Sequence, residues 1–451
     1  MNLAGRSVIV MGLGRFGGGI GVTRWLAGQS ARVTVTDQAD AETLRESIAQ
    51  LDGLPIAFQL GGHDAVDLEG CELLVVSPAV CKERSPFVQR ALDRGIPLSS
   101  EMNLFLERCR ARRIVGITGS AGKSTTTAML GSILSEATVR SADGRTWVGG
   151  NIGQSLLADL ECIEPDDVVV LELSSFQLED VAALAWSPSH AVITNLQPNH
   201  LDRHGTFEAY ADAKMNIVRY QSSEGVALVH ADADDVARRV AAAGGAGRLM
   251  RYRFDERFAG AIRVPGLHNH ANAAAAVAVA RSLGVADDVI GAGLSKFAGL
   301  PHRLEFVGER RGVRYYNDSK STTPESTCLA LEAFGEPVIL LIGGADKGMS
   351  FDTLVARAAA GAKGVVCYGQ MAPTLEKMLR DATHTAPRRG CLADSRLVRV
   401  DSLAEAVQAA MGQADRGDVV VLSPACTSYD QFINYEQRGE TFARLVRSLP
   451  D

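Results

Sequence analysis

Short runs of apolar residues recur along the whole chain, and helical stretches of mixed apolar and polar residues separate them. The runs are rich in Val, Ile and Leu and do not alternate with polar positions, which is typical of parallel strands buried on both faces. This pattern predicts an α/β fold in which ligands bind at the carboxyl ends of the strands. The predicted strands cover residues 8–11, 33–36, 73–76, 114–117, 168–171, 191–194, 338–342, 364–368 and 419–422.

The predicted strands fall into three groups along the 451 residues. A single hydrophobic core stops growing at about 250–300 residues, so the length also requires more than one domain. We predict three α/β domains, at residues 1–107, 108–300 and 301–451. The Ala- and Gly-rich stretch at 241–247 is predicted to be a helix end and a loop inside the second domain, and no linker.

The composition is that of a soluble globular protein, with a formal net charge of -7. No long basic stretch interrupts this charge, which argues against a nucleic-acid partner. No apolar run reaches the roughly 18–20 residues that span a bilayer, so no membrane partner is expected. The first predicted strand begins almost at the N-terminus, so we expect no targeting segment before the fold. The eight cysteines show no CxxC pair, which fits reduced thiols and a cytoplasmic location.

A first glycine loop, Gly-Leu-Gly-Arg-Phe-Gly at residues 12–17, directly follows the first predicted strand. Asp37 ends the second strand, and this spacing fits the dinucleotide-binding fingerprint. Glycines such as Gly14 allow the backbone to approach a pyrophosphate, and Asp37 could accept hydrogen bonds from a ribose. Ser77 closes a later strand and is expected to line the same crevice. The loop does not distinguish NAD from another diphosphate such as a UDP-sugar, or from a tight turn without a ligand.

A second glycine loop, Thr-Gly-Ser-Ala-Gly-Lys-Ser-Thr at residues 118–125, lies between a strand and a helix. Backbone N–H groups of such a loop wrap phosphates, Lys123 would offset their charge, and Ser124 would bind Mg²⁺. Ile117 stands where the strict P-loop pattern has its first glycine. Two phosphate sites in separate domains favour a kinase or a ligase over a dehydrogenase. The residues predicted to bind ATP here are Gly119, Ser120, Gly122, Lys123, Ser124 and Thr125.

Further polar residues follow the strands of the second domain. Glu172 ends the run at 168–171 and is well placed either for Mg²⁺ or for capping the next helix. His200 follows the run at 191–194, and on chemistry alone its role as a metal ligand stays open. Asn269 and Asn272 are three positions apart on one helical face, where they could contact an adenine or a phosphate, or serve as a cap and an exposed amide.

Taken together, the motifs resemble those of the Mur ligase family over essentially the whole chain. Within that family, the resemblance is to the members that add D-glutamate to UDP-N-acetylmuramoyl-L-alanine. The segments that carry it are 118–125, 149–153 (Gly-Gly-Asn-Ile-Gly), 171–178 (Leu-Glu-Leu-Ser-Ser-Phe-Gln-Leu), 200–203 (His-Leu-Asp-Arg), 266–269 (Gly-Leu-His-Asn), 301–303 (Pro-His-Arg), 317–322 (Asn-Asp-Ser-Lys-Ser-Thr), 343–347 (Gly-Gly-Ala-Asp-Lys), 423–428 (Ser-Pro-Ala-Cys-Thr-Ser) and 434–439 (Asn-Tyr-Glu-Gln-Arg-Gly).

The resemblance implies an ATP-dependent ligase of peptidoglycan synthesis that acts as a cytoplasmic monomer. It implies a Rossmann-like UDP-binding domain, a central P-loop ATPase domain and a Rossmann-like C-terminal domain that binds the amino acid. It also implies two Mg²⁺ ions, with Lys123 and Ser124 on the phosphates, Ser124 and Glu172 on one metal and His200 on the other. Lys214 matches a lysine that CO₂ carbamylates, whereas from the residues alone it would be a solvated helix lysine.

Other roles are implied by position only. The ATP would contact Asn269, Asn272, Arg303 and Asp318, with His302 as a companion contact, and Asn151 would face the muramoyl group. The glutamate would lie among Lys347, Thr322, Ser428 and Tyr435, with Lys320 nearby.

The chain departs from the family pattern at several positions, which leaves the amino-acid specificity open. Ala121 replaces a common Asn, Tyr435 a frequent Phe, and Gln-Pro-Asn at 197–199 the usual acidic residues, while residues 12–21 are unusually rich in glycine. The alternatives are a Mur-type or folate-type ligase that adds another amino acid, such as L-glutamate or L-alanine. An NAD-dependent oxidoreductase based on the first glycine loop and a non-catalytic nucleotide-binding regulator are the alternatives outside the family.

Overall fold

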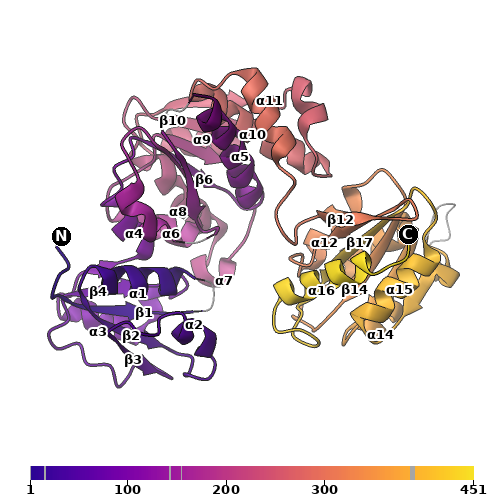
Figure 1. Cartoon of the computed structure of the whole chain (residues 1–451), viewed down its shortest axis with the longest axis horizontal. Coiled ribbons are helices and arrows are strands. Elements are labelled where there is room, and N and C mark those ends of the chain that lie inside the picture. The colour runs from indigo at the N-terminus through magenta and orange to yellow at the C-terminus, as the bar shows by residue number, and fades with distance from the viewer. Residues whose placement is uncertain (1, 15–16, 142–143, 154, 386–391) are drawn as a thin grey trace. The chain divides into compact units, whose positions relative to one another are not determined.

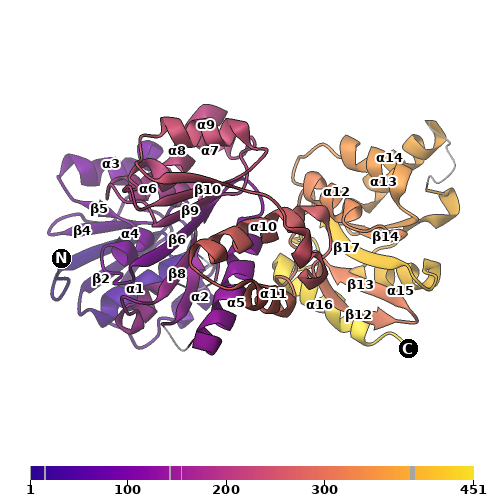
Figure 2. The ribbon, with the colours of Figure 1, turned by 90° about the horizontal axis from the view of Figure 1, so that it is seen from above.

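The computed structural model describes the chain except residues 1, 15–16, 142–143, 154 and 386–391. It contains three sheets, with strand orders β3-β2-β1-β4-β5, β11-β10-β9-β6-β8-β7 and β12-β13-β17-β14-β15-β16. Helices cover both faces of the sheets (Figures 1 and 2). The predicted α/β class is therefore confirmed.

The first sheet is wholly parallel and is buried on both faces. Val8 and Val10 pack with α1 and α4 on one face, while Ile9 and Met11 pack with α3 on the other. Burial on both faces explains why the strand reads as an unbroken apolar run. Its elements are β1 (Ser7–Met11), α1 (Gly18–Gly28), β2 (Arg32–Asp37), α2 (Arg45–Ala49), β3 (Ile56–Leu60), β4 (Leu73–Val76), η1 (Lys82–Arg84), α3 (Pro86–Asp93), β5 (Leu98–Ser99) and α4 (Glu101–Leu106).

The central sheet is also parallel, and it aligns the carboxyl ends of its strands. Ile117 in β6 pairs with Glu172 in β8, and Thr118 pairs with Ile193 in β9. Helix α5 covers one face, and α6, α8 and α9 cover the other (Figure 2). Its elements are β6 (Arg113–Thr118), α5 (Lys123–Ser141), β7 (Thr146–Gly150), η2 (Leu156–Cys162), β8 (Val168–Glu172), α6 (Ser175–Ala182), β9 (His190–Ile193), α7 (Leu201–His204), α8 (Phe207–Arg219), β10 (Val226–His230), α9 (Asp234–Ala242), β11 (Arg248–Tyr252), η3 (Glu256–Ala261), α10 (Leu267–Ser282) and α11 (Asp287–Lys296).

The third sheet is parallel except for β12, which pairs antiparallel with β13. Helices α12, α13 and α14 share a core with one face, and α15 and α16 share a core with the other. Its elements are β12 (Glu305–Arg310), β13 (Val313–Asn317), α12 (Pro324–Glu332), β14 (Val338–Gly343), α13 (Asp352–Gly361), β15 (Gly364–Tyr368), α14 (Ala372–Thr385), η4 (Asp394–Arg396), β16 (Leu397–Arg399), α15 (Leu403–Gln413), β17 (Val419–Ala425) and α16 (Tyr435–Arg447).

By contacts, the chain divides into two compact units. The first holds residues 1–256 and 271–293 with the first two sheets, and the second holds residues 257–270 and 294–451 with the third. The three predicted domain boundaries therefore stay a prediction. The stretch at 241–247 is the end of α9 and a loop, as predicted.

Two further predictions concern the whole chain. No helix in the described ranges is long and apolar enough to cross a membrane. All seven described cysteines are free thiols, and Cys391 lies outside the described residues.

Candidate active site

The second glycine loop lies at the carboxyl edge of the central sheet, between β6 and α5, where phosphate-binding loops are found. The segment after β9 holds it in place. The side chain of Ser120 donates to the carbonyl of Gln197 at 2.9 Å, and the N–H of Ala121 donates to the Asn195 side chain at 2.9 Å. The hydroxyl of Thr194 donates to the Ala121 carbonyl at 2.6 Å. Contacts within the protein thus fix the position of the loop.

Two glycines of this loop have no room for a side chain. Gly119 has a φ of 147°, and a Cβ there would lie 1.9 Å from the Thr194 hydroxyl. Gly122 has a φ of 81°, and a Cβ would lie 2.3 Å from Oδ1 of Asn272. Both backbone conformations favour glycine, so the sequence of the loop follows from its shape.

Lys123 begins α5, with the half-buried Ser124 and the buried Thr125 beside it. Its ammonium donates to the carbonyls of Gly119 at 2.9 Å and of Ser120 at 3.1 Å. The loop therefore keeps a positive charge within its own turn, as a loop that receives phosphates requires.

Glu172 ends β8 beside this loop and is 2% exposed. Its Oε1 accepts a hydrogen bond from the Asn151 amide at 2.9 Å. Its Oε2 is buried and has no hydrogen-bond partner among the described residues. A buried carboxylate oxygen without a hydrogen-bond partner lowers the stability of the fold unless a positive charge lies against it. The position of this oxygen therefore favours binding of a cation.

Lys214 lies on α8 and is 1% exposed, so the sequence-based alternative of a solvated lysine is wrong. Its Nζ donates to the Thr118 hydroxyl at 3.3 Å and lies 4.8 Å from the centroid of the Tyr210 ring. Burial, followed by repulsion from Lys123, lowers the pKa of this ammonium to about 7, although Glu172 opposes the shift. The side chain is therefore about half neutral near neutral pH.

His200 is the N-cap residue of the short helix α7, with a left-handed backbone (φ 53°, ψ 36°). Its ring lies 5.1 Å from the Phe176 ring and 6.3 Å from the Tyr210 ring, centroid to centroid. Partial burial lowers the pKa of the imidazole, although Asp202 opposes the shift. The neutral ring that results is the form that binds metal ions.

A cavity of about 560 Å³ lies next to these residues, between the first and central sheets. The predicted substrate residues Gly14, Asp37, Ser77 and Asn151 all line it. Asp37 accepts the N–H of Gly14 at 3.1 Å and so holds the first glycine loop. Residues 15–16 of that loop lie outside the described part of the chain.

The cavity also has lining residues that the sequence did not single out. Phe176 and Gln177 belong to the segment at 171–178 but carried no role of their own. Glu101 accepts a hydrogen bond from Ser155, and burial raises the pKa of its carboxyl group. No sequence signal marks Glu101, because the wall it belongs to combines two distant parts of the chain.

The second unit holds its own group of predicted residues. Asp318 is 2% exposed and accepts from the Ser423 hydroxyl at 2.8 Å and the Leu304 N–H at 3.2 Å. Burial raises the pKa of Asp318 to about 6, against the effect of these hydrogen bonds. The Tyr435 ring lies 5.9 Å from the His302 ring and 5.5 Å from Nζ of Lys320.

The remaining predicted residues differ in burial. Asn272 is 7% exposed and belongs to the first unit, where Thr126 donates to it, whereas Asn269, 5% exposed, belongs to the second. In the second unit, Ser428 is buried, Thr322 is half-buried, and Arg303 and Lys347 are exposed. Arg438, which carried no predicted role, is fully buried and ties residue 319 to residues 426–427 through its guanidinium.

Three family models match the chain, and together they cover most of it. They are described as "Mur ligase MurD-like, N-terminal domain" at residues 6–100, "Mur ligase middle domain" at 117–257 and "Mur ligase, glutamate ligase domain" at 302–426. A protein of Roseiflexus sp. named UDP-N-acetylmuramoylalanine–D-glutamate ligase is 40% identical, over 100% of both chains. The chain belongs to the Mur ligase family.

Further relatives agree with this Mur ligase assignment. A protein of the same name from Symbiobacterium thermophilum is 38% identical over 96% of this chain and 97% of its own. Among solved structures, MurC of Thermotoga maritima has a TM-score of 0.61 at 20% identity, with 98% of this chain and 99% of its own covered. MurF of Thermotoga maritima in complex with ADP has a TM-score of 0.56 at 17% identity, with 93% and 96% covered. These two structures support the fold.

One departure from the Mur ligase pattern leaves the contacts within the second glycine loop intact. Ala121 holds the loop through its backbone alone, because its N–H and carbonyl make the bonds to Asn195 and Thr194. A side chain at position 121 is not needed for these contacts.

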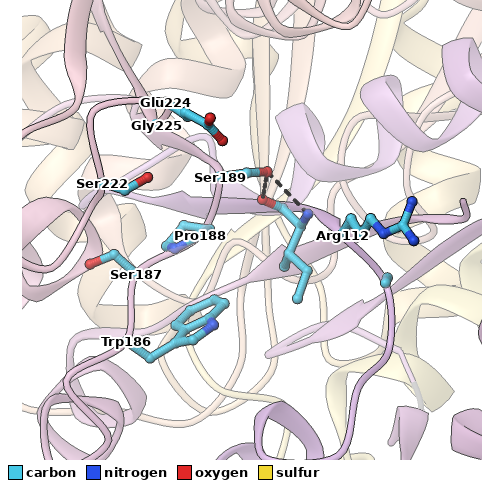
Figure 3. Close-up of a pocket in the computed structure, with 10 residues that line it drawn as sticks. Arg112, Trp186, Ser187, Pro188, Ser189, Ser222, Glu224 and Gly225 are labelled. Atoms are coloured by element: carbon cyan, nitrogen blue, oxygen red, sulfur yellow. Dashed lines mark hydrogen bonds between the residues drawn. The ribbon is translucent and has the colours of Figure 1, made fainter. Parts of the chain in front are cut away.

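A second pocket of about 360 Å³ lies at the opposite edge of the central sheet of this Mur ligase (Figure 3). Ser189 bridges its wall by donating to the Ile114 carbonyl at 2.9 Å and accepting the Ile114 N–H at 3.2 Å. Trp186, Arg112 and Glu224 also line it, and none of the predicted site residues does. Because parallel sheets bind ligands at the carboxyl ends of their strands, this amino-end pocket is separate from the candidate active site.

Proposed function

We propose that this Mur ligase joins D-glutamate to UDP-N-acetylmuramoyl-L-alanine in peptidoglycan synthesis, with ATP as the energy source. The observation that carries the proposal is the meeting of three features at one sheet edge. A phosphate-binding loop, an unpaired carboxylate oxygen on Glu172 and a buried lysine, Lys214, lie together beside a large cavity. The names of the relatives support the choice of substrates.

We also propose three functional domains, at residues 1–107, 108–300 and 301–451, which bind the UDP-substrate, ATP and the amino acid. The three sheets and the three family-model matches support this division. The proposed enzyme is a cytoplasmic monomer without a nucleic-acid or membrane partner, and the net charge of -7 supports the first of these exclusions.

The ATP phosphates are proposed to bind the N–H groups of the second glycine loop. Lys123 would exchange its two bonds to loop carbonyls for bonds to phosphate oxygens. The remaining contacts are assigned by the family resemblance alone. They are Gly119, Ser120, Gly122, Ser124, Thr125, Asn269, Asn272, Arg303 and Asp318.

Two Mg²⁺ ions are proposed, held by Ser124, Glu172, His200 and a modified Lys214. The unpaired Oε2 of Glu172 and the neutral ring of His200 fit this donor set. In the described ranges, no group of three or more His, Cys, Asp or Glu side chains could hold a metal, so the proposed donor set also includes Ser124 and the modified Lys214. When bound, Mg²⁺ neutralises the charge that develops in phosphoryl transfer.

Lys214 is proposed to be carbamylated by CO₂. Its neutral amine attacks the carbon of CO₂, a C–N bond forms, and one proton leaves to give an anionic carbamate. A neutral amine is required for this step, and the pKa of about 7 supplies one at neutral pH. The product replaces a buried cation beside Lys123 with an oxygen ligand for a metal.

The lowered pKa of Lys214 predicts a pH-dependent stability for the unmodified protein. Between pH 7 and 10.5 the unfolded chain holds a proton on this lysine that the folded chain lacks. The free energy of unfolding should therefore rise with pH in this window, by about 1.4 kcal/mol per pH unit at most. Below pH 7, Lys214 is protonated in both the folded and the unfolded chain. Burial of its charge then lowers the free energy of unfolding most.

The measurement is urea unfolding in CO₂-free buffer from pH 6.5 to 9.5, with Lys214→Met as the reference. The free energy of unfolding of Lys214→Met should exceed that of the wild type most at pH 6.5. This difference should shrink as the pH rises. A difference that does not depend on pH would contradict a buried lysine with a lowered pKa.

The cavity is proposed to bind the UDP-substrate through Gly14, Asp37, Ser77 and Asn151. Glycines are frequent where the first glycine loop lines the cavity, because backbone groups of the loop and of α1 approach one another closely there. A Cβ on Gly19 would lie 2.2 Å from the Leu13 carbonyl oxygen. The positive end of α1 can then stabilise a diphosphate through its backbone N–H groups.

Replacing Gly19 by Ala should therefore raise the KM for the UDP-substrate by about tenfold or more, since the backbone must move to relieve the clash. The KM for ATP should stay unchanged. Gly28→Ala is the matched control on the same helix, because its Cβ would meet nothing within 4 Å. Equal effects of the two variants would argue against a ligand at this helix end.

The amino acid is proposed to bind among Lys320, Thr322, Lys347, Ser428 and Tyr435, with His302 nearby. The position of Lys320 over the Tyr435 ring supports a preformed cationic group at this site. An ammonium of this kind can pair with a carboxylate of glutamate.

In the proposed reaction, the carboxylate of the UDP-substrate attacks the γ-phosphorus of ATP, and ADP leaves. The amine of glutamate then attacks the acyl phosphate carbon, phosphate leaves and a proton is released. Activation is needed because a carboxylate is a poor electrophile, and Lys123 stabilises the charge on the phosphoryl group in the first step.

The test is release of ADP and phosphate by the purified protein with UDP-N-acetylmuramoyl-L-alanine and each of D-glutamate, L-glutamate, L-alanine and diaminopimelate. We expect turnover with D-glutamate only. Turnover with another amino acid would show that the proposed amino-acid substrate is wrong. Absence of ATP cleavage with all four amino acids would refute the proposed ligase activity. A change in nicotinamide absorbance would support the oxidoreductase alternative instead.

A further inference from the structure

Helix α7 carries His200 at its N-cap but is only four residues long, and no residue of it is buried as a whole, although the side chain of His204 is 1% exposed. Leu201 is 44% exposed and gives the helix no apolar anchor. A single turn gains too little from its own hydrogen bonds to be stable alone. The left-handed backbone of His200 adds strain, which persists only when surrounding contacts enforce it. The position of His200 must therefore be fixed by contacts from α7 to other elements.

Arg203 makes the contacts on one side of α7. Its guanidinium donates to the carbonyls of Pro78 at 3.4 Å and Ala79 at 3.2 Å. It also lies 4.7 Å from the centroid of the Phe176 ring, within the range of a cation–π interaction. Pro78, Ala79 and Phe176 all line the cavity. Arg203 thus ties α7 to the cavity wall.

His204 makes the contacts on the other side, with a side chain that is 1% exposed. Its Nε2 lies 3.0 Å from the Ser175 hydroxyl, and its Nδ1 lies 3.2 Å from Oε1 of Glu179. A neutral ring satisfies both contacts, with Nδ1–H donating to Glu179 and Nε2 accepting from Ser175. The ring also stacks on Phe176 at 5.3 Å and 14°, so its orientation is fixed.

The series Ser175, His204 and Glu179 has the hydrogen-bond order of a hydrolytic triad. Ser175 is 2% exposed, so no substrate can reach its hydroxyl. The arrangement therefore holds α7 against the start of α6 and does not itself react.

We propose that Arg203 and His204 are positioning residues for phosphoryl transfer. They fix α7 to the cavity wall and to α6, and so they hold the His200 ring against Phe176 without touching substrate or nucleotide. The inference rests on the proposed function, which makes His200 a metal ligand. It adds the two side chains that keep this ligand in place.

The test compares Arg203→Met, His204→Ala and His204→Gln with the wild-type protein. The first measurement is hydrogen exchange of the segment 197–206 in metal-free, ligand-free protein. The second is the affinity for Mn²⁺, as a stand-in for Mg²⁺, measured by electron paramagnetic resonance with a non-hydrolysable ATP analogue. Arg203→Met and His204→Ala should each speed exchange about tenfold or more and weaken Mn²⁺ binding about 10–100-fold. His204→Gln should recover part of both, because an amide also offers a donor and an acceptor.

Arg239→Met is the matched control. Arg239 also lies over a phenylalanine ring, 5.3 Å from the centroid of Phe207, and pairs with Glu208 on α8 and not with a residue of α7. It should leave exchange at 197–206 and Mn²⁺ affinity unchanged.

Unchanged exchange and unchanged Mn²⁺ affinity in both Arg203→Met and His204→Ala would overturn the proposal. So would a general loss of protection over the whole chain, which would make these residues part of the overall stability. If His204→Ala does not fold, the double variant Ser175→Ala with Glu179→Gln carries the same test. The exchange result does not depend on turnover, so a wild-type protein that fails to cleave ATP would refute the proposed function separately.

Discussion

Replacing Lys214 by Ala is expected to reduce ligase activity by about a thousand-fold or more, the scale of losing a charged group that stabilises phosphoryl transfer. The structure makes this a sharp expectation, because Lys214 is 1% exposed and its Nζ reaches the Thr118 hydroxyl at the end of β6. A lysine in such a position costs stability as a cation and gains a function as a carbamate. Ala removes the proposed carbamate and leaves a space of about three methylene groups and a head group.

Short carboxylates should partly restore the activity of this variant. Formate or acetate at millimolar concentration could fill the space and supply the missing anionic oxygen. Lys123→Ala is the control, because it also removes a lysine from the site but loses a cation, which a carboxylate cannot replace. Full activity of Lys214→Ala, or equal rescue of both variants, would remove the carbamate from the mechanism.

The second large effect is expected at Glu172, at the carboxyl end of β8. Replacing it by Gln keeps the shape and the contact to Asn151 but removes the negative charge next to the unpaired Oε2. Turnover should fall by about a hundred-fold or more, since a neutral amide is a weak ligand for Mg²⁺. The thermal stability should stay the same or rise, because a buried carboxylate oxygen without a hydrogen-bond partner has been removed.

Asp167, just before the start of the same strand, is the matched control. It is also 2% exposed, but its carboxylate accepts hydrogen bonds from the Trp147 indole at 2.8 Å and the Arg145 N–H at 2.6 Å. Asp167→Asn should therefore cost about 1–3 kcal/mol of stability and leave turnover at 25 °C nearly unchanged. Thermal unfolding and steady-state kinetics on both variants decide this. If Glu172→Gln and Asp167→Asn change thermal stability and turnover in the same way, Glu172 has only a structural role.

The sequence predicted most of the parallel core of the fold, because strands buried on both faces appear as unbroken apolar runs, but it missed the interior strands β10 and β13. All nine predicted strands are present, and their limits differ by at most a few residues. The strand β12 (Glu305–Arg310) was missed because it is an antiparallel edge strand with polar residues and only partial burial. The strand β7 (Thr146–Gly150) was missed because it ends in two glycines, which are poor strand formers.

The candidate site was predicted where its residues follow one another in the chain, as in the loop at 118–125. It was missed where several elements contribute one side chain each. Glu101, Arg203 and His204 have ordinary sequence surroundings, and only their contacts give them a role. The burial of Lys214 has the same origin, since helix periodicity alone does not say which lysine faces inward. The roles taken from the family resemblance stay predictions for each residue until the variants are measured.

The close fit between Gly21 on α1 and Ser155 has a consequence for how this enzyme can change. A Cβ on Gly21 would lie 2.6 Å from the Cβ of Ser155, so one of the two positions must stay small. Orthologues with a larger residue at position 21 should carry glycine or a displaced backbone at position 155. Correlated substitution of these two sites across evolution would record the packing of α1 against the segment around Ser155.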